Sequence, residues 1–381
     1  MSTEPIVIAG AGIGGLTTAL ALHARGFRVQ ILDSARELRP LGVGINLLPH
    51  AVRELTDLGL GEALLAMSAN PAVIDFYRSD GALLFREPRG IEGGYGHPQC
   101  SVHRGRLQML LLDAVRSRLG PDAVHTGTRV TGFTDRRRAV VVHTTAGDVC
   151  GAALVGADGI GSRVRAILHP GPDPLLTSGV TMYRGAARMT PFRDGRTMAI
   201  IKGANGIDLI TYPIRGHEVN WVAQVPDHPP GPLPGAAQWN APATAEDVLP
   251  HLSGWRLDWL DPVELLASTA NIFSYPMVDK DPLPHWGRGR VTLLGDAAHP
   301  MYPVGANGAS QAIVDARVLA DHVATDGIAG LPGYEDERRR ETADVIAANR
   351  DMHGTGAART ADELDLITRR YRTETAESAR S

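Results

Sequence analysis

The feature that most constrains the fold is a glycine-rich turn near the start of the chain. Four apolar residues, Ile6–Ala9, precede the sequence GAGIGG at positions 10–15. A helix-like stretch, 14–25, follows, and a second apolar run, 28–33, ends in Asp33. A short buried strand, a glycine turn and a helix in this order predict a parallel βαβ unit at the start of an α/β domain.

The turn has the spacing of a dinucleotide-binding fingerprint. Gly10 permits a tight turn, Gly12 lets the backbone approach a pyrophosphate, and Gly15 lets the helix pack closely on the strand. The free N–H groups at the helix start then favour the phosphates. Asp33 is placed to accept hydrogen bonds from a ribose. A glycine-rich packing turn is the alternative, and the fingerprint does not separate FAD from NAD(P).

Apolar periodicity along the chain predicts two interleaved domains. Helices are expected over 46–58 and 104–119, one strand over 149–155 and a proline-rich loop over 227–242. A nucleotide-binding α/β layer is predicted from segments 1–70, 101–175 and 285–330. An inserted, mostly antiparallel sheet that covers the substrate is predicted from segments 71–100 and 176–284. A C-terminal helical segment is predicted over 331–381.

Composition argues against several other classes of protein. The net charge of −4 provides no footprint for nucleic acid, and the basic run 136–138 lies between strand-like segments, as in a hairpin turn. Two cysteines favour a reducing compartment, and no His/Cys cluster has metal-ligand spacing, so no metal is expected. The uncharged stretch 5–22 lacks a preceding positive region and contains four glycines. We therefore expect a cytoplasmic protein without a membrane span.

Two further segments place an aspartate after an apolar strand. In LVGADGIGSRVR, residues 154–165, Asp158 follows the strand and Ser162 can cap the next helix. In LLGDAAHPMYPVGANGASQ, residues 293–311, Asp296 is followed by no charged residue until Asp315. Because α/β sheets bind ligands at the carboxyl ends of their strands, both aspartates are expected near the glycine turn.

These three motifs, in this order and spacing, resemble the class A flavoprotein monooxygenases, the group that contains para-hydroxybenzoate and salicylate hydroxylases. The resemblance implies a Rossmann-like FAD-binding domain with an inserted substrate sheet and C-terminal helices. It implies that Asp33 and the first glycines hold the ADP half of FAD, that Asp158 supports the pyrophosphate region or the pyridine nucleotide path, and that Asp296 binds the ribityl chain. The residues predicted to bind the cofactor are Gly10, Gly12, Gly14, Gly15, Asp33, Val43, Gly44, Arg104, Gln108, Asp158, Gly295, Asp296, Pro303, Gly305, Ala306, Asn307 and Gly308.

Within this group, the chain most resembles the phenazine-carboxylate monooxygenases of pyocyanin formation. This closer resemblance is found in segments 41–46, 275–290 and 293–311. The Gly-Gln-Gly that is commoner in the family after the proline is replaced here by Gly305-Ala306-Asn307-Gly308. The contact usually made by that glutamine is therefore expected to differ. A helix that starts near Gly308 would direct its N–H groups at the N1–C2=O edge of the flavin, which stabilises the reduced, anionic ring by about 0.3–2 kcal/mol.

The resemblance implies a single-component enzyme that uses NAD(P)H and O2 to hydroxylate a small, electron-rich aromatic through a C4a-hydroperoxyflavin. Loss of CO2 would follow where the attacked carbon carries a carboxylate. No second glycine fingerprint is evident, so NAD(P)H is expected to bind transiently. Arg184 is a candidate for a substrate carboxylate, and Tyr212 and Tyr302 are candidates for aromatic walls. Ordinary sheet packing explains the tyrosines equally well, and His299 is expected to fix its loop rather than act as a base.

Two alternatives remain at this stage. The chain could be a flavin-dependent hydroxylase or epoxidase that tailors a polyketide or an indole in secondary metabolism. From a different class, it could be a non-catalytic flavin-binding sensor. A small-molecule aromatic is the expected partner, with neither nucleic acid nor a membrane, and a monomer or homodimer is the expected assembly.

Overall fold

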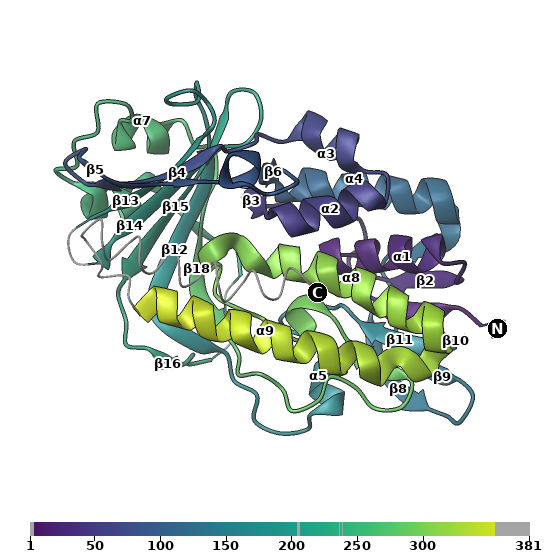
Figure 1. The fold of residues 1–381 in the computed structure, drawn as a ribbon. Helices are drawn as coiled ribbons and strands as arrows, with labels where there is room; N and C mark the ends of the chain where they lie inside the picture. Colours follow the sequence, from purple (N-terminus) through teal and green to yellow (C-terminus); the bar gives the residue numbers. More distant parts are fainter. Residues whose placement is uncertain (1–3, 204–205, 236, 238, 355–381) are drawn as a thin grey trace.

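The computed structural model describes residues 4–203, 206–235, 237 and 239–354. A parallel sheet with its helices forms one part of the molecule, and a large, mostly antiparallel sheet forms the other (Figure 1). Helix α9, Leu331–Gly354, runs along the first part toward the large sheet. This arrangement confirms the predicted fold class.

The parallel sheet draws its strands from distant parts of the chain. Its order is β19-β11-β1-β2-β7, and every neighbouring pair is parallel. Parallel strands carry their carboxyl ends to one edge, so the segments after β1, β11 and β19 meet there. The strands are β1 Ile6–Ala9, β2 Val29–Leu32, β7 Val124–His125, β11 Ala153–Gly156 and β19 Val291–Leu293.

Helices α1 and α8 pack against each other beside this sheet. A Cβ atom added at Gly14 would lie 2.9 Å from Leu294 Cδ2 and 3.3 Å from Ala312 Cβ, so Gly14 permits the close approach of α1 and α8. The helices of this part are α1 Ile13–Ala24, α2 Pro49–Asp57, α3 Gly61–Met67, α4 Arg104–Leu119, α5 Arg163–Leu168 and α8 Asn307–Asp326.

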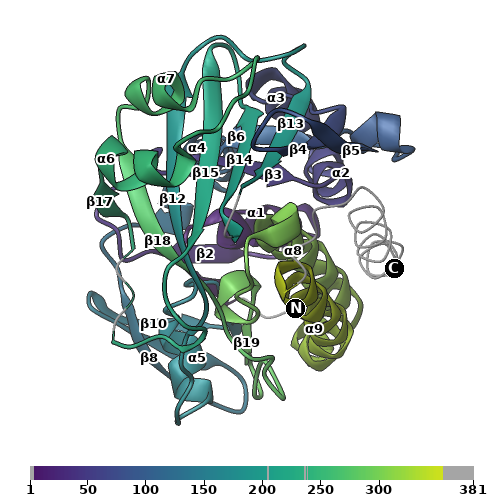
Figure 2. The ribbon, with the colours of Figure 1, turned by 90° about the vertical axis from the view of Figure 1, so that its left-hand side faces the viewer.

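The large sheet has nine strands in the order β17-β18-β12-β15-β14-β13-β4-β5, with β16 paired to β12. Its neighbouring strands are antiparallel except for β13 and β4. Figure 2 shows α6 and α7 on one side of this sheet. The strands are β4 Val73–Arg78, β5 Leu83–Pro88, β12 Leu176–Arg188, β13 Thr197–Lys202, β14 Asp208–Pro213, β15 Glu218–Pro226, β16 Gly231–Pro232, β17 Ala241–Ala243 and β18 Ile272–Asp279.

The two faces of the large sheet differ in what they bury. Trp221, Ile201 and Leu209 belong to the core that packs under α6, Ala245–Val248, and α7, Pro262–Ala267. Alternate residues on the same strands form a separate apolar cluster that includes Tyr302, which precedes α8. The second face is therefore the one that meets the nucleotide-binding part.

Two small sheets complete the fold. Strand β3, Gly44–Leu47, pairs with β6, Cys100–His103, and joins the two parts. The other sheet has β9 at its centre and consists of β8 Val130–Asp135, β9 Val140–Thr144 and β10 Gly147–Gly151. Residues 136–138 lie in the turn between β8 and β9, as the sequence predicts.

Three sequence predictions of local structure are wrong. The helix predicted over 46–58 begins only at Pro49, because Asn46 lies in β3 and its side chain accepts hydrogen bonds from Gln99 and Ser101. The strand predicted over 149–155 is divided between β10 and β11, which lie in different sheets. The loop predicted over 227–242 contributes the short strand β16 and the start of β17.

Two kinds of feature are absent from the described residues: a helix that could span a membrane and a cluster of metal ligands. None of the described helices combines the length and the apolar character that a membrane span requires. In the same part of the chain, no group of three or more His, Cys, Asp or Glu side chains could hold a metal ion. Of the C-terminal segment predicted over 331–381, residues 331–354 form α9, and 355–381 lie outside the described residues.

Candidate functional site

The glycine turn after β1 is closed by contacts from two directions. Gly10 has a φ of +104°, and a Cβ there would lie 2.3 Å from the oxygen of Ala157, on the segment after β11. A Cβ at Gly15 would lie 2.0 Å from the oxygen of Gly10. A Cβ at Gly12, by contrast, would meet nothing within 4 Å. Two glycines are therefore fixed by backbone contacts, and the third leaves open space at the start of α1.

Asp33 is tied to this turn. One carboxylate oxygen accepts the N–H of Ala11 at 2.7 Å, and the other accepts the N–H of Ala35 at 2.8 Å. Gln108, on α4, donates from its side chain to the oxygen of Ala11 at 2.8 Å. Two predicted cofactor residues thus hold the residue between Gly10 and Gly12.

Asp158 caps the short helix α5. Its carboxylate accepts hydrogen bonds from the Ser162 hydroxyl and from the N–H of Arg163 at 2.7 Å. The Cα of Asp158 lies 3.1 Å from the position of a Cβ added at Gly10. Asp158 therefore supports the segment that presses on the glycine turn, and its role at the cofactor stays a prediction.

Arg165 links the second motif to the third. The buried guanidinium donates to the main-chain oxygens of Ala297 at 3.2 Å and Ala298 at 2.9 Å, and it forms a two-point ion pair with Asp173. Lys280 also donates to Asp173. Sequence reasoning missed Arg165, although an arginine seven positions after the motif aspartate is a visible signal.

The turn after β19 places a carboxylate among buried neighbours. The side chain of Asp296 is exposed, whereas Gly295 and Ala297 on either side are buried. Surrounding protein atoms nevertheless desolvate the carboxylate and raise the pKa of Asp296, and the nearby charges of His299 and Arg104 oppose this shift. An accessible carboxylate within dense protein is arranged to accept hydrogen bonds from a ligand.

A buried ion network lies beneath this turn. Asp315, on α8, accepts the N–H of Gly295 at 3.0 Å, His299 Nε2 at 2.6 Å and Arg338 Nε at 2.7 Å. Burial alone would raise the pKa of Asp315, but His299 and Arg338 outweigh it and lower the pKa to about 2. His299 Nε2 is held by Asp315, which supports the predicted loop-fixing role, while His299 Nδ1 is buried without a hydrogen-bond partner among the described residues.

The loop between Tyr302 and α8 has an unusual backbone. Gly305 and Ala306 both have left-handed φ angles, +69° and +62°. Left-handed backbone at a non-glycine residue costs about 1–2 kcal/mol, so the surrounding contacts must hold Ala306 in place. Asn349, on α9, contributes by donating to the oxygen of Tyr302 at 3.2 Å. Helix α8 begins at Asn307, one residue before the predicted start, with no acidic residue in its first turn.

Gly44 connects this region to the large sheet. Its N–H donates to the side-chain oxygen of Asn220 at 2.7 Å, and its oxygen accepts Arg184 Nη2 at 3.1 Å. Two donors here have no partner: Arg184 Nε and Asn220 Nδ2 are buried without a hydrogen bond to any described residue. Since an unsatisfied buried donor costs about 1–3 kcal/mol, both are suited to a ligand that supplies acceptors.

Arg104 brings its charge to the same place. It is the first residue of α4, and its N–H donates to the oxygen of Val43 at 2.9 Å. Its positive charge lowers the pKa of both Asp296 and Tyr275, opposing the effect of desolvation on each. Arg104 therefore lies between the turn after β19 and the large sheet.

The candidate substrate residues also converge. Burial raises the pKa of Tyr212 to about 12, and the nearby charge of Arg184 opposes this shift. Arg184 lies over the ring of Tyr275, with its Cζ 5.9 Å from the ring centroid. Tyr302 lies in an apolar cluster with residues of β12, β14, β15 and β18. The members of this apolar cluster are Val180, Met182, Ile210, Val222, Tyr275, Met277, Tyr302 and Val304.

These features fit FAD. The fixed turn at Gly10 and the open space at Gly12 suit a pyrophosphate, and the exposed Asp296 suits ribityl hydroxyls. The unpaired side-chain donor of Asn220 suits a carbonyl or nitrogen acceptor such as those of an isoalloxazine ring. Pro303 and Gly308 flank the strained loop beside them, and a Cβ at Gly308 would lie 3.8 Å from Asp296 Oδ1.

Known proteins are similar to this chain over most of its length. The sequence profile of the FAD binding domain family matches residues 3–349. The chain is 48% identical to phenazine 1,6-dicarboxylic acid hydroxylase PhzS of Lysobacter antibioticus over 91% of this chain and 89% of that protein. It is 35% identical to 3-hydroxybenzoate 6-hydroxylase 1 of Aquipseudomonas alcaligenes over 91% of this chain and 87% of that protein. The predicted resemblances are thereby confirmed.

Solved structures agree in fold. Klebsiella pneumoniae HpxO in complex with FAD and uric acid has a TM-score of 0.80 at 24% identity, covering 99% of this chain and 95% of that one. A salicylate hydroxylase substrate complex has a TM-score of 0.77 at 24% identity, covering 100% and 98%. FAD is the cofactor, and NAD(P)H and O2 are the co-substrates typical of these monooxygenases. The chain belongs to the FAD binding domain family, as one of its class A aromatic hydroxylases.

Proposed function

We propose that this enzyme hydroxylates a flat, fused aromatic carboxylate of the phenazine type, using NAD(P)H and O2. The observation that carries this proposal is the buried, unpaired Nε of Arg184 beside an apolar wall. An arginine that keeps a free donor can hold a carboxylate, and the wall can accept the ring. The 48% identical relative is named for a phenazine dicarboxylic acid, which supports the same class of substrate.

The predicted cofactor residues then have separate tasks. The pyrophosphate would lie at the start of α1, where Gly10, Gly12 and Gly15 leave room for it. The carboxylate of Asp33 would accept hydrogen bonds from the ribose through the lone pairs that its bonds to backbone N–H groups leave free. Asp296 would accept from the ribityl chain. When bound, FAD supplies the electron transfer and oxygen activation that no side chain provides.

Residues of the two motif loops would hold the ring system. The backbone of Val43 and Gly44 and the backbone of the loop that precedes α8 would both contribute to this part of the site. The first turn of α8 contains no acidic residue of its own, and its N–H groups would attract negative charge. The predicted cofactor residues that would surround the ring and the ribityl chain are Val43, Gly44, Arg104, Gln108, Gly295, Pro303, Gly305, Ala306, Asn307 and Gly308.

The chain's own residues would position the substrate and keep water out. With its pKa raised to about 12, Tyr212 stays neutral at physiological pH. Its oxygen can accept from Arg184 while its proton remains available to a substrate oxygen. Tyr302 also stays neutral, because desolvation and the charge of Asp279 raise its pKa to about 12. Neither tyrosine is therefore a base at neutral pH, and both act as hydrogen-bond donors or walls.

A substrate panel tests the proposal. Phenazine-1-carboxylate, phenazine-1,6-dicarboxylate and salicylate are offered to the FAD-loaded enzyme with NAD(P)H and labelled ¹⁸O2. We expect a phenazine carboxylate to gain one labelled oxygen, as read by mass spectrometry. Accelerated NAD(P)H oxidation with release of peroxide alone would mean that the substrate belongs to another class.

Matched variants test the proposed carboxylate contact. Arg184→Lys keeps the positive charge and removes the fork, so KM for a carboxylated substrate should rise about 10-fold while FAD content stays normal. Tyr212→Phe should raise KM by a smaller factor, about 3-fold, since one neutral hydrogen bond is lost. Equal losses with a carboxylate and with its methyl ester would contradict the contact.

We also propose a cytoplasmic monomer or homodimer. Both cysteines are free thiols in the structure, and Cys100 is buried, which supports a reducing compartment. Light scattering of the FAD-loaded protein at several concentrations separates the two assemblies, and a larger oligomer would overturn this assignment.

A further inference from the structure

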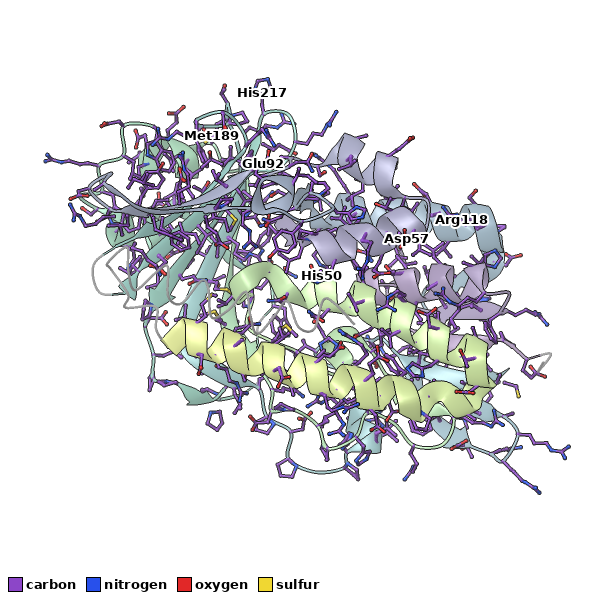
Figure 3. The ribbon with its side chains drawn as sticks, in the orientation of Figure 1. His50, Asp57, Glu92, Arg118, Met189 and His217 are labelled. Atoms are coloured by element: carbon purple, nitrogen blue, oxygen red, sulfur yellow. The ribbon has the colours of Figure 1, made fainter. Side chains whose placement is uncertain are left out.

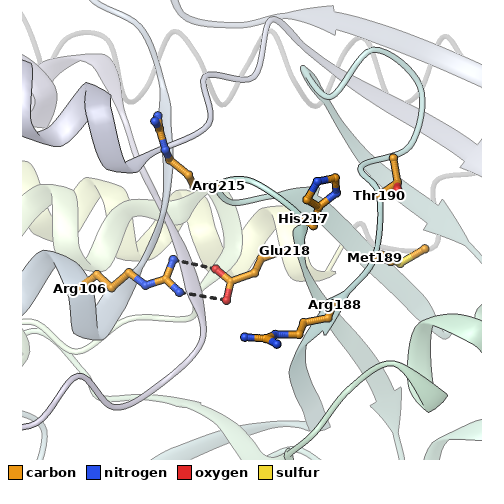
Figure 4. A pocket seen from close by; sticks show the side chains of 7 residues that line it. All are labelled: Arg106, Arg188, Met189, Thr190, Arg215, His217 and Glu218. Carbon is orange, nitrogen blue, oxygen red and sulfur yellow. Dashed lines mark hydrogen bonds and ion pairs between the residues drawn. The ribbon is translucent and has the colours of Figure 1, made fainter.

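A surface pocket of about 540 Å³ lies at the end of the large sheet, outside the site described above. Three segments form it: the first turn of α4, the end of β12 and the turn that joins β14 to β15 (Figure 4). Met189 and His217 mark its place at the sheet end that is remote from α9 (Figure 3). The lining residues are Arg106, Arg188, Met189, Thr190, Arg215, His217 and Glu218.

The pocket carries an excess of positive charge. Arg106 forms a two-point ion pair with Glu218, at 2.7 and 3.0 Å. The guanidinium groups of Arg188 and Arg215 have no hydrogen bond or ion pair to any described residue. Two free guanidinium groups, together with the donors of Thr190 and His217, suit a phosphate, which accepts several charged hydrogen bonds at once.

The pocket is connected to the proposed flavin site through two elements. Arg106 lies two residues after Arg104 in the first turn of α4. Arg188 lies four residues after Arg184 on β12, so both side chains point to the same face of the sheet, about 13 Å apart along the strand. A dinucleotide with its phosphates at Arg188 can extend its other end toward Arg184.

We propose that this pocket binds the phosphate groups of the reduced pyridine nucleotide. The inference rests on the proposed function, because that function requires NAD(P)H as the reductant. An exposed site with a partly neutralised charge also suits a co-substrate that binds and leaves in every cycle. The phosphate could be the pyrophosphate, which NADH and NADPH share, or the 2′-phosphate, which only NADPH carries.

The test uses the FAD-loaded enzyme without oxygen and follows reduction of the flavin by NADH and by NADPH in a stopped-flow instrument. Arg188→Ala and Arg215→Ala should each raise the apparent Kd about 10-fold, and the double variant more, with an unchanged limiting rate. Equal losses for both nucleotides identify the pyrophosphate, and a loss for NADPH alone identifies the 2′-phosphate. Arg116→Ala, an exposed arginine at the other end of α4, is the matched control and should change neither Kd.

A variant that removes a negative charge from the pocket is expected to have the opposite effect on nucleotide binding. Glu218→Gln removes the one carboxylate among the described residues that line the pocket, so NAD(P)H should bind about 3-fold more tightly. Unchanged Kd values in both arginine variants would overturn the proposal, as would weaker binding of the aromatic ligand with normal nucleotide binding. Flavin reduction needs no identified aromatic substrate, so a wrong substrate assignment would leave this result intact.

Discussion

The carboxylate of Asp315 accepts the main-chain N–H of Gly295 at 3.0 Å, across twenty positions of the chain. Gly295 has a φ of +60° and opens the turn that carries Asp296. His299 Nε2 contacts the same carboxylate oxygen of Asp315, and Arg338 donates to the other oxygen. The shape of the proposed ribityl turn therefore depends on a charge network that the ligand itself would not touch.

Asp315→Ala should destabilise the FAD-free protein by about 3–5 kcal/mol. Its removal leaves the guanidinium of Arg338 buried with reduced compensation, and breaking a buried pair has an effect of this size. Urea unfolding followed by circular dichroism measures the change. Asp326→Ala, an exposed carboxylate at the end of the same helix, should change stability by less than about 0.5 kcal/mol. Similar losses in both variants would contradict the importance of the network.

The same residue should shape the response to acid. The pKa of Asp315 is about 2 in the folded protein and about 4 when unfolded, so its contribution is present above pH 4 and is lost as pH falls toward 2. Asp315→Asn should therefore flatten the dependence of unfolding free energy on pH within this window. The slope should not vanish, because Asp173 also has a pKa lowered to about 2, by Arg165 and Lys280, which outweigh its desolvation. An unaltered slope would refute the assignment.

Arg165→Met should weaken FAD binding about 10-fold or more, because the main-chain oxygens of Ala297 and Ala298 lose their charged donor. Quenching of flavin fluorescence on titration of the FAD-free protein measures the Kd. Arg163→Met, two residues earlier and exposed, is the control and should retain normal affinity. Normal affinity in the Arg165 variant would show that the turn after β19 holds its shape without this contact.

Asp296→Asn should separate cofactor affinity from stability. Purified protein should contain little FAD, because one charged acceptor for the ribityl chain is lost. The FAD-free protein should become slightly more stable at pH 7, since protein surroundings raise the pKa of Asp296 and the ionised group is disfavoured there. Absorbance at the flavin bands and thermal unfolding report the two effects. A fall in both quantities would point to misfolding instead.

The sequence predicted the elements whose local pattern and tertiary contacts agree. The predicted bounds of β1 and α4 match the structure, because an unbroken apolar run and a helical repeat specify them locally. The helix predicted from residue 46 fails because Asn46 accepts a hydrogen bond from Ser101 in a distant strand, β6. The apolar pattern of the sequence also misses the boundary between β10 and β11, because these consecutive strands are distinguished by the different sheets to which they belong.

The site residues also fall into two groups: those that a local motif identifies and those that act through contacts with distant parts of the chain. Gly10, Asp33 and Asp296 belong to local motifs, and the structure brings them to one edge of the sheet. Arg165 and Arg338 act through contacts across the fold, and no local pattern assigns their partners. Gly14 also has a tertiary role that its place in the fingerprint does not reveal, since it lets α1 meet α8.

The order of strands in the parallel sheet has a consequence for synthesis on the ribosome. Its central strand is made first, but the neighbouring β11 and β19 follow after roughly 150 and 290 residues, and Arg338 comes later still. A nascent chain that has not yet released α9 therefore lacks the turn that carries Asp296 in its final shape. Capture of the flavin nucleotide must then be a late event, completed near or after the end of translation.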